Sequence, residues 1–255
     1  MDDLQAVGLG TMGIDDPATI ETAIELGYRH LDTAQIYGNE SIVGEGIERS
    51  ALDRDALFVA TKVWIDKLGP ESIEESTAAS LDRLGLANVD LLSVHRPRGD
   101  YDPETTLPAF DDLRARGVIE HVGVSNFTVE QLETAREYLA VPIFANQVEY
   151  HPLYQPTAAL ADAQAHDYYL VAYSPLANGR ANDIPEVVEI ADKHDVTPQA
   201  VCLAWLTAKD NLVTIPKASR ETHLRANREA PDLTLDPADH ETIDSIQRED
   251  EIFPE

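Results

Sequence analysis

The sequence predicts a closed (β/α)8 barrel, and two features of its 255 residues point to that fold class. Short runs of apolar and β-branched residues alternate with amphipathic segments, which is typical of a parallel sheet covered by helices. Polar residues of reactive types follow one predicted strand after another at its C-terminal end, where such a barrel carries its active site. An open doubly wound sheet shares the alternation but gathers its reactive groups at one crevice. We therefore expect the closed barrel.

Eight strands are expected, with helices between them. The strands are predicted over residues 4–9, 28–32, 57–61, 89–94, 118–124, 143–148, 168–173 and 212–215. The helical spacing of apolar residues is clear over 70–84. Helices are expected to begin near Pro17, Pro70 and Pro103, each beside an acidic residue, because proline suits the first turn of a helix. No linker interrupts this pattern, so we expect residues 1–255 to form a single barrel domain.

The charge of the chain is far from balanced. There are 47 acidic residues against 19 basic ones, which gives a formal net charge of -28 and a pI near 4.4. The acids are scattered over many segments, so they do not form an interaction tail. Concentrated salt would screen their mutual repulsion. We expect a protein adapted to a high-salt cytoplasm, with no nucleic acid partner; an acidic protein from an ordinary cell is the alternative.

Other bulk features bear on compartment and redox chemistry. No apolar run is long enough to span a membrane, and the first residues do not resemble a signal peptide. A cytoplasmic protein without membrane contact is therefore expected. Cys202, the single cysteine, excludes an internal disulfide and is expected to be a small buried side chain among apolar neighbours. We expect no metal in the site.

A glycine-rich motif near the start resembles a dinucleotide-binding fingerprint. Gly8, Gly10 and Gly13 match G-x-G-x-x-G, and Asp32 follows at about the expected interval. That motif requires a helix to begin inside it, so that helix amides reach a pyrophosphate. Pro17 would disrupt a helix that already ran from Gly10. The glycines are therefore interpreted as a tight turn beneath a ligand at the mouth of the first strand.

Four residues at successive strand ends form a chemically sensible set: Asp32, Tyr37, Lys62 and His95. Carbonyl reduction needs a hydride on carbon and a proton on oxygen, and a tyrosine hydroxyl can supply the proton if its pKa falls. An ammonium group beside the phenol favours the phenolate, and a carboxylate would hold that ammonium in place. The histidine could orient the substrate oxygen through a neutral N–H or donate the proton itself. Each residue also has a structural explanation when taken alone.

Several motifs resemble the aldo-keto reductase family over nearly the whole chain. They are GYRHLDTAQIYGNE (27–40), VATKVW (59–64), LLSVHRP (91–97), GVSNF (123–127), NQVEYHP (146–152), AYSPLA (172–177) and IPKASR (215–220). The resemblance implies a (β/α)8 barrel that binds a nicotinamide cofactor, NADPH or NADH or both, without a Rossmann fold. It also implies that Asp32, Tyr37, Lys62 and His95 are the catalytic tetrad, with Tyr37 the general acid.

The resemblance assigns further residues to the cofactor. Ser125, Asn126 and Gln147 would hold its carboxamide, Tyr173 would stack on its nicotinamide ring, and Thr11 would lie near its ribose. The diphosphate and adenosine part would lie along Ser174, Leu176, Lys217, Ser219, Arg220, His223 and Asn227. Amide and hydroxyl side chains do complement a carboxamide, and an aromatic face suits a flat ring.

The adenosine-phosphate pocket departs from the family pattern. Ala218 stands where the family usually has a serine, and His223 stands where it has an arginine that grips the 2′-phosphate of NADPH. A guanidinium clamps phosphate permanently, whereas histidine is mostly neutral at pH 7. We therefore predict weak discrimination in favour of NADPH and real use of NADH.

The substrate pocket is expected to be open. Relative to the family, the chain lacks an N-terminal hairpin beneath the barrel and has a short C-terminal loop. Met12, Trp64, Tyr101 and Phe127 are the expected apolar walls. Such a pocket would admit small aldehydes, ketones or sugar-derived carbonyls. A monomer is expected, as is usual in the family.

Three functions remain in competition at this point. The first is reversible carbonyl reduction by direct hydride transfer, and the second is a cofactor-binding regulatory module without significant turnover. The third is an open-sheet dehydrogenase, which the predicted barrel disfavours.

Overall fold

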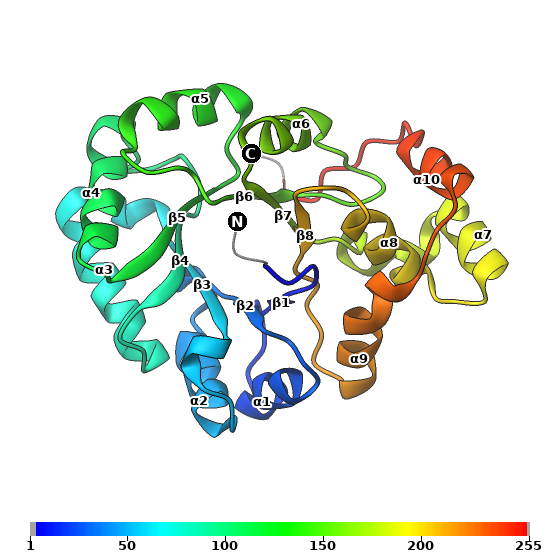
Figure 1. The fold of residues 1–255 in the computed structure, drawn as a ribbon, viewed down its shortest axis with the longest axis horizontal. Coiled ribbons are helices and arrows are strands. Elements are labelled where there is room, and N and C mark those ends of the chain that lie inside the picture. The colour runs from blue at the N-terminus through cyan, green and yellow to red at the C-terminus, as the bar shows by residue number, and fades with distance from the viewer. Residues whose placement is uncertain (1–3, 254–255) are drawn as a thin grey trace.

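The computed structural model describes residues 4–253, and it confirms the predicted barrel. Eight parallel strands follow one another in chain order around the sheet, and the helices surround them (Figure 1). The strands are β1 (Leu9–Gly10), β2 (His30–Asp32), β3 (Phe58–Val63), β4 (Val89–Val94), β5 (Ile119–Ser125), β6 (Ala145–Glu149), β7 (Tyr169–Tyr173) and β8 (Leu212–Thr214). Each lies within one of the eight ranges predicted from the sequence or overlaps it by at least half of its own length.

Backbone contacts between the first and last strands complete the barrel. Val7, just before β1, forms a parallel bridge with Thr214 of β8. The Gly8 amide donates to the Thr214 carbonyl over 2.8 Å, and the Thr214 amide donates to the Ala6 carbonyl over 2.9 Å. These bonds satisfy strand edges that an open sheet would leave unpaired.

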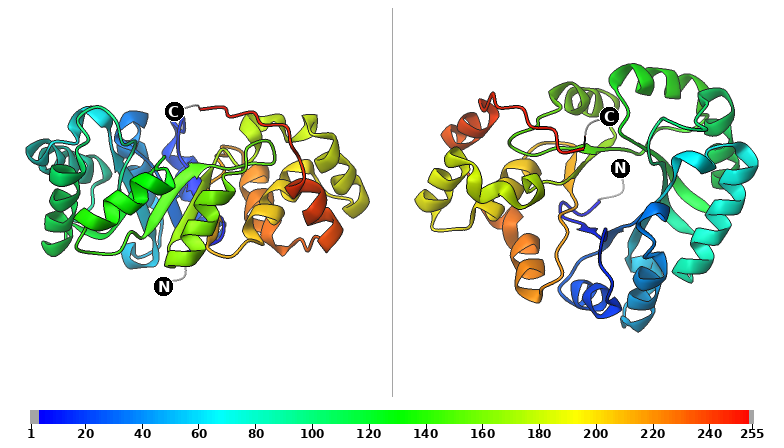
Figure 2. Two further views of the ribbon diagram at one scale, coloured as in Figure 1. Left: turned by 90° about the horizontal axis from the view of Figure 1, so that it is seen from above. Right: turned by 180° about the vertical axis from the view of Figure 1, so that it is seen from behind.

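Ten α-helices are described around the sheet, and Figure 2 shows the same arrangement from above and from behind. They are α1 (Pro17–Glu25), α2 (Glu40–Arg49), α3 (Pro70–Leu84), α4 (Pro103–Ala115), α5 (Val129–Tyr138), α6 (Thr157–His166), α7 (Pro185–His194), α8 (Pro198–Thr207), α9 (Glu221–Glu229) and α10 (Pro237–Asp244). Within residues 4–253, no helix has the length and apolar character needed to cross a bilayer.

The position at which α1 begins shows that the glycine-rich motif does not open a helix. Asp16 caps this helix by accepting a hydrogen bond from the Ala18 amide, and Pro17 occupies its first turn. The helix therefore begins after the motif. At Gly10, a side chain would meet the Ile215 carbonyl at 2.5 Å, so glycine permits β1 to lie against the segment after β8.

The two ends of the barrel are built differently. At the N-terminal ends of the strands an aromatic layer closes the interior, and ring centroids lie 5.4 Å apart for His30 and Phe58 and 4.0 Å apart for His121 and Phe144. Tyr169 extends the layer from Phe144. The C-terminal ends carry polar side chains instead. As predicted, Cys202 is buried, within α8.

Candidate active site

The C-terminal ends of the strands surround a cavity of about 770 Å³, a size typical of sites for small molecules and cofactors. Most of the residues predicted from the sequence lie on its wall. They are Thr11, Met12, Asp32, Tyr37, Trp64, His95, Ser125, Asn126, Gln147, Tyr173, Ser174, Leu176 and Lys217. The structure thus brings together side chains from the first strand to the segment after the last one.

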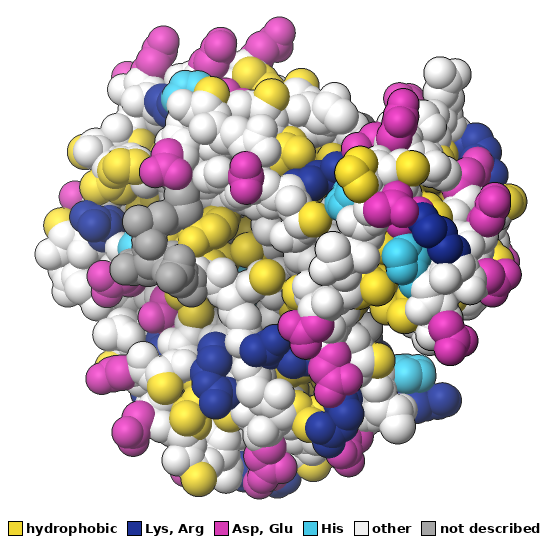
Figure 3. Space-filling model, turned by 45° about the vertical axis from the view of Figure 1, so that its right-hand side comes forward, with side chains coloured by type: hydrophobic (Ala, Val, Ile, Leu, Met, Phe, Trp, Pro, Cys, Tyr) yellow, Lys and Arg dark blue, Asp and Glu magenta, His cyan; other side chains and the backbone are white. Residues whose placement is uncertain are grey.

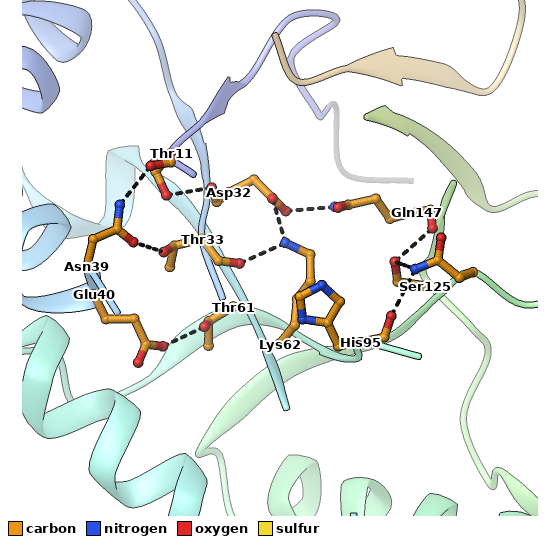
Figure 4. Close-up of polar contacts among 11 residues, drawn as sticks. Thr11, Asp32, Thr33, Asn39, Glu40, Thr61, Lys62, His95, Ser125 and Gln147 are labelled. Carbon is orange, nitrogen blue, oxygen red and sulfur yellow. Dashed lines mark hydrogen bonds and ion pairs between the residues drawn. The ribbon is translucent and has the colours of Figure 1, made fainter. Parts of the chain in front are cut away.

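Lys62, in β3, lies beneath this wall and is bonded to the end of β2 (Figure 4). Its side chain is 1% exposed, and its ammonium donates to the Asp32 carboxylate over 2.6 Å and to the Thr33 carbonyl over 2.7 Å. The same nitrogen lies 5.2 Å from the centre of the Tyr37 ring. Lys62 is inside β3 and not at its end as predicted, since β3 continues to Val63.

The pKa of Tyr37, beside Lys62, differs from the prediction. Burial raises the pKa of Tyr37, and the opposing effect of the nearby Lys62 ammonium, including a hydrogen bond between the two side chains, does not cancel it. Burial alone would lower the pKa of Lys62, but Asp32 and Tyr37 outweigh it and raise this pKa. The sequence-based expectation of a lowered pKa for Tyr37 considered the Lys62 ammonium but not the removal of the phenol from water. In this arrangement the phenol is neutral and the ammonium is charged at neutral pH.

His95 lies beside Tyr37 as a neutral imidazole. Its ring meets the Tyr37 ring edge-on at 5.9 Å and the Trp64 ring at 4.9 Å. Burial, Lys62 and Arg96 together lower the pKa of His95 to about 2. A group with so low a pKa carries no spare proton at pH 7. A neutral ring can donate one hydrogen bond through its N–H.

Asp32 is held by two strands at once. One of its oxygens accepts from Lys62, and the other accepts from the Gln147 amide over 2.8 Å. Gln147 belongs to β6, on the far side of the barrel from β2. Both side chains are buried, so the carboxylate is fixed across the barrel interior and cannot swing away from the ammonium.

The amide and hydroxyl side chains predicted to hold a carboxamide form one network. Ser125 donates to the Gln147 carbonyl over 2.8 Å, and the Asn126 amide donates to the His95 carbonyl over 3.0 Å. The Tyr173 hydroxyl donates to the Asn126 side-chain oxygen over 3.0 Å. The oxygens of Ser125 and Asn126 each retain acceptor capacity, since each has a second lone pair. The network therefore fits an amide ligand at this wall.

Backbone strain marks the same wall. Asn126, Ser174 and Asn178 line the cavity with φ values of 62°, 50° and 54°. Residues other than glycine adopt this left-handed region at a cost, and such residues cluster where a ligand is bound. Two of the three lie after β7, where the resemblance places the diphosphate of the cofactor.

A supporting network beneath the cavity has no counterpart in the predictions. The Asn39 amide donates to the carbonyls of Thr11 and Ile14 over 2.7 and 3.0 Å, and its oxygen accepts from the Thr33 hydroxyl. Asn39 thereby joins the turn after β1 to Thr33, whose carbonyl holds Lys62. Asn39 lies in the motif GYRHLDTAQIYGNE (27–40), but the local sequence gave no signal of a supporting role.

Buried Glu40 supplies a second support. It accepts from the Thr61 hydroxyl over 2.6 Å and from the Arg83 guanidinium, so that α2, β3 and α3 are joined next to Lys62. Only the pairing with a positive charge permits a carboxylate at 1% exposure.

Some predicted residues do not lie on the cavity wall. Phe127 is buried at 2% exposure and packs edge-on against Tyr101 at 5.4 Å, so neither forms part of the wall. The residues predicted for the adenosine end, namely Ser219, Arg220, His223 and Asn227, lie beyond Lys217 at the start of α9 and within it. The wall also includes residues that the sequence analysis missed, among them Ile36, Arg96, Asn178 and Phe253.

A closed parallel barrel with a lysine–tyrosine pair beneath a strained, amide-lined cavity defines a class of barrel reductases that act on carbonyl groups. The chain belongs to the aldo/keto reductase family, whose model matches residues 6–248. The family resemblance noted from the motifs is confirmed, as is the prediction of an NAD(P)H-dependent carbonyl-reducing enzyme.

Similar proteins agree with this assignment. The chain is 36% identical to the methylglyoxal reductase DkgB of Salmonella typhi, over 98% of the chain and 95% of that protein. It is 34% identical to a glyoxal reductase of Bacillus subtilis (strain 168), over 97% of the chain and 90% of that protein. The crystal structure of MGS-M4, an aldo-keto reductase from a deep-sea metagenome library, superimposes with a TM-score of 0.94 at 34% identity, covering 99% of this chain and 95% of that one.

Proposed function

We propose that this enzyme reduces small aldehydes and dicarbonyl compounds with Tyr37 as the proton donor. The observation that carries the proposal is the placement of the Lys62 ammonium, bonded to Asp32 at 2.6 Å and lying 5.2 Å from the Tyr37 ring centre. A neutral phenol on a cavity wall, backed by a fixed positive charge, is suited to give up a proton to a substrate oxygen.

The protein's own groups divide the work. The hydride for the carbonyl carbon would come from a nicotinamide cofactor held at this wall. His95, as a neutral imidazole, donates a hydrogen bond to the carbonyl oxygen and aims it at the phenol. The Tyr37 hydroxyl transfers its proton to that oxygen, and the phenolate that remains is stabilised by Lys62. Asp32 and Gln147 keep the ammonium in position throughout.

The cofactor assignments are also proposals. Ser125, Asn126 and Gln147 would hold the carboxamide, and Tyr173 would stack on the ring. Lys217 lines the cavity, whereas exposed His223 lies on α9, beyond it. Because His223 stands where the family has an arginine that binds the 2′-phosphate of NADPH, we infer that the enzyme uses NADH in addition to NADPH.

The substrate class follows from the relatives. Proteins similar to this chain are named for methylglyoxal and glyoxal, and a structure at 35% identity with a TM-score of 0.90 is titled a putative 2,5-diketo-D-gluconic acid reductase B. All three substrates carry more than one carbonyl group. We infer that short dicarbonyl compounds are among the substrates here, and that the apolar walls of Met12, Ile36 and Trp64 contact their carbon atoms.

The surface supports adaptation to high salt. Asp and Glu side chains are scattered over the face shown in Figure 3, interspersed with fewer Lys and Arg, in keeping with the net charge of -28. We propose that the enzyme works as a monomer of one domain in a salt-rich cytoplasm. Molar salt would then stabilise the fold by screening repulsion.

One experiment tests these proposals together. Oxidation of NADPH and of NADH is followed over a panel of aldehydes and dicarbonyls at 0.1 M and 2 M KCl, with melting temperatures measured in the same buffers. We expect turnover of dicarbonyls with both cofactors and a higher melting temperature in 2 M KCl. Cofactor binding without turnover would favour the regulatory alternative, and equal melting temperatures would remove the salt adaptation.

A further inference from the structure

The segment after α10 returns to the barrel as a strap, which we define as residues 246–253. In Figure 1 it runs from α10 back toward β6 and β7, and the side view in Figure 2 shows it crossing above the sheet. Asp250, inside the strap, is bonded to two other parts of the protein. The Asp250 amide donates to the Leu153 carbonyl over 2.8 Å, and the Asp250 carboxylate pairs with Arg180 at 2.6 Å.

Glu149, the last residue of β6, binds the end of the strap through two hydrogen bonds, which we call the grip. One of its oxygens accepts from the Ile252 amide over 2.7 Å, and the other accepts from the Phe253 amide over 2.9 Å. His151 contacts the first of these oxygens at 2.8 Å. The Glu149 side chain is 2% exposed, so these bonds form away from competing water.

The ionised state of Glu149 suits this grip. Burial alone would raise the pKa of its carboxyl, but the hydrogen bonds from His151, Ile252 and Phe253 outweigh it and lower this pKa. A carboxylate presents two acceptor oxygens to two successive amides. A carboxamide of the same shape would present only one, because its nitrogen is a donor facing an amide N–H.

The grip places Phe253 on the cavity wall. The Phe253 ring lies 5.9 Å from the Tyr173 ring, inclined at 72° to it. Tyr173 is the last residue of β7, and Trp64 follows β3. These two strands are four apart in a barrel of eight, so the two residues lie on opposite sides of the cavity. Met12, Ile36 and Trp64 all come from the segments after β1, β2 and β3. Phe253 therefore adds an aromatic ring to the wall that follows β7, where Leu176 also lies, opposite Trp64.

We propose that Glu149 is a positioning residue that sets substrate specificity by holding Phe253 in the cavity wall. The carboxylate does not touch the substrate; it fixes the backbone from which Phe253 projects. Phe253 enlarges the apolar surface opposite Trp64, which favours carbonyl compounds with an apolar substituent over fully polar ones. This inference rests on the proposed carbonyl-reductase function of the same cavity.

The kinetic test compares Glu149→Gln with Phe253→Ala, using phenylglyoxal and glyoxal as substrates. Both variants are expected to raise KM for phenylglyoxal about five- to tenfold, because each loses the apolar contact between the phenyl group and the Phe253 ring. KM for glyoxal, kcat, and the dissociation constant of the cofactor should each stay within about twofold. Exposed Glu137→Gln on α5 is the matched control and should leave all of these constants unchanged.

The double variant separates positioning from general damage. If Glu149 acts through Phe253, adding Glu149→Gln to Phe253→Ala should raise KM no further. Equal effects of Glu149→Gln in the two backgrounds would overturn the inference, as would an equal loss of activity toward glyoxal and phenylglyoxal.

A readout without turnover keeps this test distinct from the proposed function. Glutamyl endopeptidase cleaves after Glu249 and Glu251 of the strap, and intact-mass measurement follows the loss of the terminal fragment. Cleavage should be about fivefold faster in Glu149→Gln than in the wild type or Glu137→Gln, because the strap detaches more often. Unchanged cleavage would overturn the grip, whereas absence of carbonyl turnover in the wild type, with faster cleavage in Glu149→Gln, would overturn only the proposed function.

Discussion

His30 and Lys62 show how two ends of one barrel treat a buried nitrogen base. They come from adjacent strands, and each side chain is 1% exposed. Neither ring nitrogen of His30 has a hydrogen-bond partner within residues 4–253, and burial lowers its pKa to about 4. Lys62 has a carboxylate at 2.6 Å, and its pKa is raised. Burial is the same at both positions, so the partner decides which one stays charged.

The two ends of the barrel differ in whether they hold a charge. We call the N-terminal ends of the strands the floor of the barrel and the C-terminal ends its mouth. At the floor, Phe58 packs edge-on against His30, and the interior excludes charge. At the mouth, Asp32, Gln147 and Thr33 surround one ammonium. The second arrangement is expensive to assemble in a protein interior, and it is found where the proposed proton transfer needs it.

The largest effect is expected when the charge at the mouth is removed. Lys62→Met should lower kcat/KM by about 10²- to 10⁴-fold, because the phenolate would lose its counter-charge. It should also lower the free energy of unfolding by about 3–5 kcal/mol, because Asp32 would remain buried without a cation. Steady-state kinetics and urea unfolding measure the two losses. Exposed Lys67→Met is the control, and activity close to wild type in Lys62→Met would break the comparison.

At the floor, the expected effect is on stability and depends on pH. The folded pKa of His30, about 4, is below its ordinary value of 6.5. Between these two pH values the histidine is protonated in the unfolded chain but not in the folded protein. The free energy of unfolding therefore falls as pH drops from about 6.5 to about 4. This residue should account for about 3 kcal/mol of that loss. His30→Leu should flatten the dependence in urea unfolding at a series of pH values, whereas exposed His223→Leu should not.

His95 sharpens the comparison because it lies at the mouth and yet behaves like His30. With its pKa lowered to about 2 and that of Tyr37 raised, neither group changes charge between pH 5 and 9. The profile of kcat/KM for carbonyl reduction should therefore be flat over this range within about twofold. An inflection near pH 6.5 that disappears in His95→Asn would show that the imidazole titrates and would reopen its role as proton donor.

The smallest effect is expected at the adenosine end, outside both regions. His223→Arg should shift the ratio of kcat/KM for NADPH over NADH about tenfold toward NADPH, because a guanidinium adds a charged hydrogen bond to the 2′-phosphate. Arg225→Lys on the same helix is the control. An unchanged ratio in His223→Arg would remove the inference that this histidine relaxes cofactor choice.

The sequence predicted those features that are repeated or local. All eight strands lie close to their expected positions because apolar runs recur with helices between them. Asp32, Tyr37, Lys62 and His95 came from their places at successive strand ends, and the structure brings them together. The start of α1 followed from the chemistry of Pro17 alone.

The features that the sequence did not predict depend on distant contacts. Phe253 lies on the cavity wall, and its amide bonds to Glu149, 104 positions earlier. The short ending therefore led us to expect an open pocket, although Phe253 forms part of the wall. Likewise, the raised pKa of Tyr37 depends on how deeply the fold buries it. No local pattern carries such information.

The most direct test of the proton-donor role is the removal of one oxygen atom. Tyr37→Phe should reduce the single-turnover rate of methylglyoxal reduction about 10²- to 10⁴-fold in stopped-flow measurements, with the cofactor dissociation constant within about twofold of wild type. Tyr138→Phe, on exposed α5, is the control. A Tyr37→Phe variant that keeps the wild-type rate would contradict the account.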